Sequence, residues 1–224
     1  MENLLLKYKS LNIKAVLRIT KLKHFAVKMD AILSKFEIDK YESLKTETGR
    51  QEFLLGRYSA KKAYAQLNQQ DNLKNIEIKN GIFEQPFFAY NSDFDVSISH
   101  TKGAAGAIVF DKAYPMGFDM ELICNSKISA LQVATKDEEI MRLNVSHEKS
   151  LTMAWCLKEA LSKAIRTGFT IPLELLQIED FVKISDKDVF TCRFKNFAQY
   201  KGIAKINGDH VVALSYPKQL TAKV

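Results

Sequence analysis

The feature that most constrains the fold is an order of elements that is repeated in the two parts of the chain. Each part has a long helical pattern followed by strands that end in an apolar hairpin, VSISHTKGAAGAIVF at 96–110 and YKGIAKINGDHVVALSY at 200–216. The two parts share the order and pattern of these elements but have little sequence identity. This repeated order predicts two similar α+β halves, and a cleft between such halves is the natural place for a ligand.

The predicted elements set the boundary between the halves. Helix formers dominate residues 24–68, and residues 147–167 form a second helix that ends at Gly168. Apolar and polar residues alternate over 95–110, which predicts a hairpin. Tyr114-Pro115 is the boundary, so the halves are 1–114 and 115–224. We expect each half to be a long helix packed on a small, mostly antiparallel sheet.

Composition excludes several classes of protein. Hydrophobic residues make up 46% of the 224 residues and charged residues 26%, as in a folded domain. No apolar run reaches the roughly 18 residues that would cross a bilayer, and the N-terminal segment does not resemble a signal peptide. The three cysteines include no C-x-x-C pair, which disfavours a disulfide framework or a zinc site. We expect a cytoplasmic protein with no membrane partner.

The net charge of +7 favours a polyanionic partner, although a lysine-rich solvated surface explains it equally well. Only six of the 33 basic residues are Arg, which mildly disfavours sequence-specific DNA binding. A zinc pattern, an RNP-like motif and a helix-turn-helix signal are all lacking in the sequence. We therefore expect no nucleic-acid partner.

Two carboxylates two residues apart form the first candidate site. Residues 117–123 alternate as a strand, so Asp119 and Glu121 project on one side. Mg²⁺ takes one or two carboxylates and completes its octahedron with water and phosphate oxygens. Alternating acidic residues on an exposed strand are also common, so this pattern alone leaves both readings open.

A stripe on the second long helix forms the next candidate. Trp155, Glu159 and Lys163 follow one another at i, i+4 steps and share a helix face. Glu159 and Lys163 are either functional or a surface ion pair that stabilises the helix by about 0.3–0.5 kcal/mol.

Basic residues in the first half complete the set. His100 begins a turn that contains Lys102, where a phosphate ligand, acid–base chemistry and a structural role are all open. Arg57 and Lys61 lie one helical turn apart and repel each other unless an anion lies against them, although solvated cations are the default.

Taken together, four segments resemble the Sfp-type 4'-phosphopantetheinyl transferases. They are GRYSAKKA at 56–63, VSISHTKG at 96–103, GFDMEL at 117–122 and WCLKEALSKAIRTG at 155–168. The segments come in the family's order and at spacings that the family accepts. The resemblance implies two pseudo-equivalent α+β halves with coenzyme A in the cleft.

The resemblance also implies roles for the matching residues. Asp119 and Glu121 match the metal-binding carboxylates, and Glu159 matches a third acidic residue that is a metal ligand or general base. Lys163 matches the lysine that stabilises phosphate charge. Residues assigned to the coenzyme A phosphates and the nucleotide end are His100, Ser99, Arg57, Lys61 and Lys158, together with Lys163.

The implied reaction is the transfer of 4'-phosphopantetheine from coenzyme A to a serine of an acyl or peptidyl carrier protein. It releases 3',5'-ADP and depends on Mg²⁺, as in enzymes of the holo-[acyl-carrier-protein] synthase type. A single chain with two pseudo-equivalent halves needs no second copy, so we expect a monomer. The alternative is a non-catalytic module of the same fold that binds coenzyme A or a carrier protein.

One segment departs from the family pattern. Many relatives carry Gly-Lys-Pro where this chain has Gly81-Ile82-Phe83-Glu84-Gln85-Pro86. Gln85 takes the place of the expected basic residue, so a phosphate contact is either lost or supplied by Lys79 or Lys102.

Overall fold

The computed structural model describes residues 5–8, 11–90, 93–168, 170–185 and 188–223. Contacts divide the chain into two compact units. Unit 1 comprises Met1–Tyr114 with Thr221–Val224, and unit 2 comprises Pro115–Leu220. The division differs from the predicted halves at the C-terminus, because strand β13 (Thr221–Lys223) pairs with β1 (Leu5–Tyr8) of unit 1.

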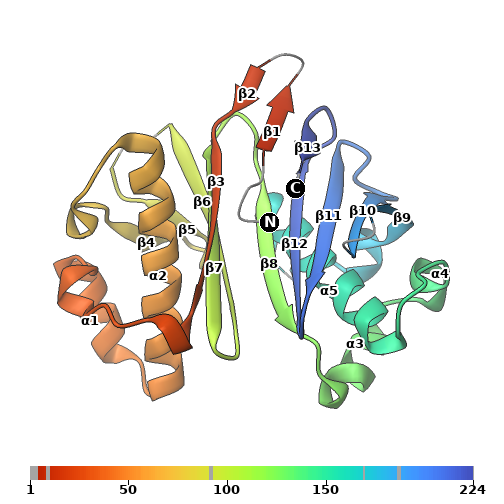
Figure 1. Cartoon of the computed structure of the whole chain (residues 1–224), viewed down its shortest axis with the longest axis horizontal. Helices are drawn as coiled ribbons and strands as arrows, with labels where there is room; N and C mark the ends of the chain where they lie inside the picture. Colours follow the sequence, from red (N-terminus) through yellow and green to blue (C-terminus); the bar gives the residue numbers. More distant parts are fainter. Residues whose placement is uncertain (1–4, 9–10, 91–92, 169, 186–187, 224) are drawn as a thin grey trace. The chain divides into compact units, whose positions relative to one another are not determined.

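Unit 1 packs the long helix α2 (Glu47–Asn68) against an antiparallel sheet of order β3-β7-β6 (Figure 1). These strands are β3 (Ala15–Lys21), β6 (Phe94–Thr101) and β7 (Ala104–Asp111), which confirms the predicted hairpin. Helix α1 (Lys35–Ser43) is separate from α2, so the helical pattern over 24–68 contains two helices. The remaining strands are β2 (Leu11–Ile13), β4 (Ile78–Asn80) and β5 (Pro86–Phe88).

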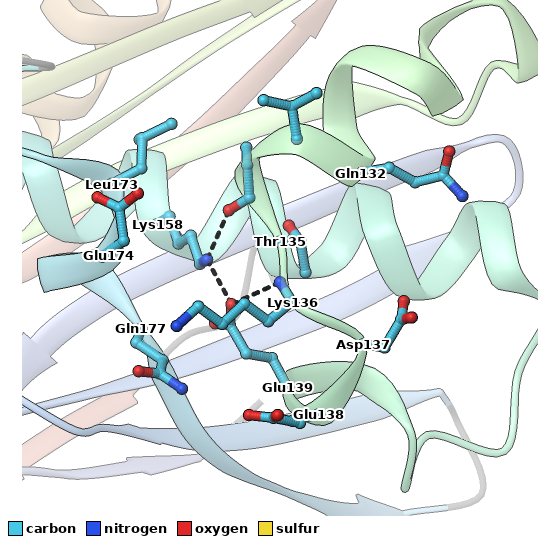
Figure 2. A pocket seen from close by; sticks show the side chains of 12 residues that line it. Gln132, Thr135, Lys136, Asp137, Glu138, Glu139, Lys158, Leu173, Glu174 and Gln177 are labelled. Carbon is cyan, nitrogen blue, oxygen red and sulfur yellow. Dashed lines mark hydrogen bonds and ion pairs between the residues drawn. The ribbon is translucent and has the colours of Figure 1, made fainter.

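Unit 2 packs helix α5 (His147–Ala164) against a five-stranded antiparallel sheet of order β8-β12-β11-β10-β9. Its strands are β8 (Gly117–Leu122), β9 (Ile178–Ser185), β10 (Val189–Phe194), β11 (Tyr200–Asn207) and β12 (His210–Pro217). Two short helices, α3 (Ile128–Ala134) and α4 (Asp137–Ile140), connect β8 to α5. A cavity of about 500 Å³ lies beside α4 (Figure 2).

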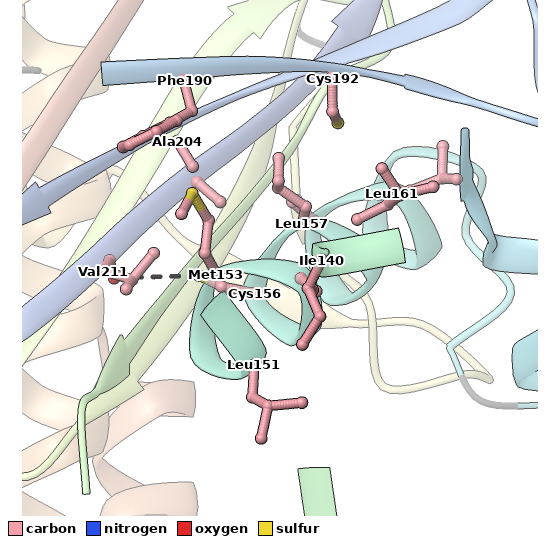
Figure 3. Close-up of a cluster of buried hydrophobic side chains, with 14 of the residues drawn as sticks. Ile140, Leu151, Met153, Cys156, Leu157, Leu161, Phe190, Cys192, Ala204 and Val211 are labelled. Atoms are coloured by element: carbon pink, nitrogen blue, oxygen red, sulfur yellow. Dashed lines mark hydrogen bonds between the residues drawn. The ribbon is translucent and has the colours of Figure 1, made fainter. Parts of the chain in front are cut away.

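The core of unit 2 lies between α5 and its sheet (Figure 3). Leu157 and Leu161 on the helix and Phe190 and Cys192 on β10 are all buried there. Unit 1 repeats this arrangement on a smaller scale, with Ala60 of α2 buried against its own sheet. The predicted fold class, two α+β units that each pack a long helix on an antiparallel sheet, is confirmed. Within the described part of the chain, no helix is long and apolar enough to span a membrane.

Candidate active site

The predicted carboxylates of unit 2 lie where strand β8 passes close to helix α5. A Cβ atom on Gly117 would lie 1.9 Å from the Ala160 carbonyl oxygen, so this approach requires glycine. Asp119 and Glu121 follow at two-residue steps and therefore share the strand face of Gly117. The glycine thus brings both carboxylates to the helix that carries Glu159 and Lys163.

Lys163 joins two of these carboxylates. Its Nζ lies 2.6 Å from Asp119 Oδ1 and 3.9 Å from Glu159 Oε2. Asp119 is 2% exposed, whereas the Lys163 side chain is 27% exposed. Burial alone would lower the Lys163 pKa, but the charges of Asp119 and Glu159 outweigh it and raise that pKa. Lys163 is therefore a charged amine at the edge of a carboxylate cluster.

Glu121 is held by a cation that the sequence analysis did not assign. Lys127 Nζ donates to Glu121 Oε2 at 2.8 Å, and this hydrogen bond raises the Lys127 pKa. With Lys127 and Lys163 against the carboxylates, no three acidic, His or Cys side chains of the described residues already form a metal-ready cluster. A metal ion would bind by displacing these lysines from the carboxylates.

The pKa of Glu159 depends on the charges of the other two carboxylates. Burial raises its pKa to about 7, and the negative charges of Asp119 and Glu121 add to this effect, while Lys163 opposes it. A divalent cation would relieve the repulsion and favour the ionised form. Three hard oxygen donors beside a protonated amine fit Mg²⁺ together with a phosphate-bearing ligand.

In unit 1, a cavity of about 350 Å³ contains two of the predicted nucleotide-binding residues, Arg57 and His100. Arg57 Nη2 donates to Asn80 Oδ1 at 2.8 Å, and its guanidinium lies over the Phe53 ring. His100 is 55% exposed and its Nδ1 lies 3.2 Å from Glu52 Oε2. The cavity thus combines cationic donors with an aromatic wall.

Gln85 does not replace the expected basic residue in this cavity. Its side chain turns under Gly81, and Gln85 Oε1 accepts from the backbone N–H of Phe83 at 3.0 Å. Neither suggested substitute is among the residues that line the cavity, but Lys40 is. Lys79 instead lies near Glu77 and over the Phe36 ring.

The structure contradicts two assigned cofactor contacts, Lys61 and Lys158. Lys61 is fully buried and pairs with Glu37, and its Nζ also donates to the Ile32 carbonyl oxygen at 2.7 Å. Figure 2 shows the same arrangement for Lys158, whose Nζ lies 2.8 Å from Glu139 Oε1. Both amines are buried and hydrogen-bonded inside their own unit, Lys158 at the wall of the cavity beside α4, so we correct their roles to structural ones.

Ser99 was assigned a place beside His100. Successive residues of a strand point to opposite faces, so Ser99 lies on the other face of β6 from His100. It is also 6% exposed and does not line the cavity. The structure therefore does not bring Ser99 and His100 together.

Sequence reasoning missed the acidic partners Glu37, Glu139 and Glu52. A signal existed for Glu37, because Ser34 and Glu37 form a capping box at the start of α1. Glu139 opens α4 in a related way, with Oε1 accepting from the Lys136 N–H at 2.9 Å. For Glu52, the sequence held no signal that separates it from the other carboxylates of the helices.

Comparisons with known proteins find relatives for the part of the chain that carries these carboxylates. The sequence profile of the 4'-phosphopantetheinyl transferase superfamily matches residues 115–215. A holo-[acyl-carrier-protein] synthase of Staphylococcus carnosus is 33% identical over 90 residues, covering 37% of this chain and 77% of the relative. The synthase of Lactococcus lactis subsp. lactis is 30% identical over 89 residues, covering 36% and 75%.

Among solved structures, the holo-(acyl-carrier-protein) synthase of Bacillus anthracis in complex with CoA (3',5'-ADP) is similar to part of the chain. The identity is 24% and the TM-score 0.38, with 43% of this chain and 93% of the other covered.

The family profile and the sequence relatives define the class of protein, a transferase. The chain belongs to the 4'-phosphopantetheinyl transferase superfamily. The family inferred from the motifs is thereby confirmed at this level, and the protein is a 4'-phosphopantetheinyl transferase.

Proposed function

We propose that this protein transfers 4'-phosphopantetheine from coenzyme A to a serine hydroxyl of an acyl or peptidyl carrier protein, in a Mg²⁺-dependent reaction. The observation that carries the proposal is the cluster of Asp119, Glu121, Glu159 and Lys163 on β8 and α5. This cluster lies inside the region that matches the family. A module that only binds a carrier protein has no need of a lysine paired with Asp119 and Glu159, or of carboxylates close enough to raise the pKa of Glu159.

The proposed reaction forms a bond between the serine oxygen and the β-phosphorus of coenzyme A. The bond from that phosphorus to the bridging oxygen breaks, and 3',5'-ADP leaves with the bridging oxygen and its electron pair. Asp119, Glu121 and Glu159 would hold the metal ion. When bound, Mg²⁺ supplies Lewis-acid stabilisation of the pyrophosphate charge.

The residues of this chain then have separate tasks. Glu159 accepts the serine proton; it must be ionised for this role, and the metal ion that it would help to hold favours the ionised form. Lys163 neutralises charge on the oxygens around the reacting phosphorus. His100 and Arg57 bind the nucleotide end of coenzyme A through the unit 1 cavity, and Lys40 adds positive charge there.

A basic surface suits the proposed macromolecular substrate. Carrier proteins of this class are typically acidic around the serine that is modified, and this chain carries a net charge of +7. Charge attraction of this kind speeds encounter and weakens as ionic strength rises. We propose further that the enzyme acts as a monomer in the cytoplasm.

The direct test is intact-protein mass spectrometry of an apo carrier protein incubated with this protein, coenzyme A and Mg²⁺. We expect the carrier to gain the mass of one phosphopantetheine unit. The gain should be lost with EDTA and return when excess Mg²⁺ is added. No gain with several acyl and peptidyl carriers, from a protein that is folded by circular dichroism, would favour a binding-only module.

A further inference from the structure

Glu52 lies in the unit 1 cavity directly against His100. A Cβ atom on Gly56 would lie 3.0 Å from Ile98 Cγ2, so helix α2 and strand β6 approach closely at that point. Glu52 precedes Gly56 by one helical turn, and His100 follows Ile98 by two residues on the same strand face. The close approach therefore sets Glu52 opposite His100, with 3.2 Å between Oε2 and Nδ1.

The charge of Glu52 is unexpected in a cavity that takes phosphate groups. Lys40, Arg57 and His100 favour an anion there, whereas Glu52 and Glu84 repel one. Glu84 stabilises the turn between β4 and β5, because its Oε2 accepts a hydrogen bond from Asn80 Nδ2 at 2.9 Å. Glu52 has a different neighbour, since its carboxylate lies against the one histidine of the cavity.

The ring of His100 has two nitrogens, and Glu52 lies near only one of them. A protonated imidazole donates from both nitrogens. With Nδ1 directed at Glu52, the Nε2–H donor remains for a ligand, and ring rotation is restrained. Among the described residues, Glu52 is the only charged partner of His100.

We propose that Glu52 is a positioning residue for the nucleotide end of coenzyme A, which makes this inference rest on the proposed function. Glu52 pairs with the Nδ1 end of the His100 imidazolium and directs Nε2–H toward a phosphate of the ligand. The carboxylate thus strengthens the binding of an anion by holding the cation that contacts it, just as a carboxylate hydrogen-bonded to a metal-bound histidine orients that ring.

The direction in which one substitution changes the affinity for 3',5'-ADP distinguishes this positioning role from simple charge repulsion. If Glu52 only adds negative charge, Glu52→Gln should tighten the binding of 3',5'-ADP. If Glu52 positions His100, the same change should weaken binding by about threefold to fivefold, because it removes the negative charge that holds a partly exposed imidazolium. Titration calorimetry with 3',5'-ADP measures the difference directly.

Two further variants complete the binding test. Glu84→Gln removes the same charge from the same cavity without touching His100, and we expect equal or tighter binding. In a cycle with His100→Ala, Glu52→Gln should have no further effect once His100 is gone. In the transfer reaction, Glu52→Gln should raise KM for coenzyme A and leave kcat unchanged. Unchanged or tighter 3',5'-ADP binding by Glu52→Gln would overturn the proposal.

A measurement without nucleotide keeps the inference separate from the proposed function. The ¹⁵N shifts of the neutral His100 ring, assigned with His100→Ala, report which nitrogen carries the proton. We expect the proton on Nδ1 in the natural protein and on Nε2 in Glu52→Ala. A proton on Nε2 in both proteins would exclude the Glu52 contact, even if the enzyme transfers phosphopantetheine. If the protein neither binds 3',5'-ADP nor transfers, the proposed function fails, and the ring nitrogens still decide whether Glu52 positions His100.

Discussion

Units 1 and 2 contain the same buried arrangement of a lysine and a glutamate, which we term the clasp. In unit 1 the clasp is Lys61 with Glu37, and in unit 2 it is Lys158 with Glu139. Each lysine comes from the long helix, and each also donates at 2.7 Å to the carbonyl oxygen of the residue five positions before its glutamate.

The glutamates of the two clasps make matching backbone contacts. Each accepts at 2.9 Å from the N–H of the residue three positions earlier, Ser34 in unit 1 and Lys136 in unit 2. Each also accepts from the first residue of the next strand, Ile78 at 3.3 Å and Ile178 at 2.7 Å. The two units are therefore built on one frame, in which the clasp ties two helices to a strand.

The chemistry carried by that frame differs between the units. Counted from the hairpin turns, Ala107 and Ala213 are equivalent, and their partners on the neighbouring strands are Arg18 and Asp119. Arg18 donates to Gln66 at 2.8 Å where Asp119 meets Lys163 at 2.6 Å.

The other two carboxylate positions also differ. Thr20 is equivalent to Glu121 by the same register, and Lys62 is equivalent to Glu159 because each directly follows its clasp lysine. Unit 1 therefore keeps the frame and has none of the three carboxylates. The comparison teaches that the frame supplies only the positions, and that a few side chains on one strand and one helix decide which unit is suited to the proposed chemistry.

The largest expected effect tests whether the proposed chemistry depends on the side chains of unit 2 and not on those of unit 1. Asp119→Asn should abolish most transfer, by about three orders of magnitude, because a metal site supplies several kcal/mol of charge stabilisation. The matched change in unit 1, Arg18→Gln, should leave kcat close to its natural value. Initial rates by carrier-protein mass spectrometry measure both. Equal losses in the two variants would refute the assignment of the chemistry to unit 2.

The next effect concerns the clasps. Lys158→Met leaves the buried Glu139 without its cation, and we expect it to destabilise the protein by about 3–5 kcal/mol. Lys61→Met removes one of two cations from Glu37, because Arg57 Nε lies 3.4 Å from Glu37 Oε1, so we expect a smaller loss of stability. Urea denaturation followed by circular dichroism measures the loss. Lys62→Met, an exposed neighbour of Lys61 on the same helix, is the control and should cost little.

The clasp experiment also tests the corrected role of Lys158. Replacing both charges of the unit 2 clasp, as in Glu139→Gln with Lys158→Met, should recover part of the stability lost in Lys158→Met. A Lys158→Met protein that is as stable as the natural one but has a raised KM for coenzyme A would return Lys158 to the cofactor site.

Sequence patterns predicted the frame well and the site only in part. The 3.6-residue spacing on α5 placed Glu159 and Lys163 on one helix face, and the alternation on β8 placed Asp119 and Glu121 on one strand face. The same helical spacing cannot distinguish a cation that faces solvent from one enclosed by another element. Lys61 and Lys158 were misassigned because their partners, Glu37 and Glu139, are about 20 residues away in sequence and meet them only through tertiary packing.

The smallest expected effect is a pH dependence of the protein's stability that comes from the carboxylates of unit 2. In the metal-free protein, the raised pKa of Glu159, about 7 against 4.5, means that the folded state keeps a proton that the unfolded chain releases between these pH values. This contribution to stability is fully present below about pH 4.5 and is lost as pH rises through 7. Its size is roughly 1–3 kcal/mol.

Urea unfolding in EDTA from pH 4.5 to 8 tests this, with Glu159→Gln compared against the natural protein. The natural protein should lose stability relative to the variant as pH rises. Lys62→Gln, at the equivalent position of unit 1, should not change that pH dependence. Mg²⁺ should reverse the trend, because it binds the ionised carboxylate and stabilises the folded state more at high pH. If the free energy of unfolding changes with pH in the same way for the natural protein and Glu159→Gln, the carboxylates of β8 and α5 do not act on one another. The two units would then not differ in the electrostatic way that we infer.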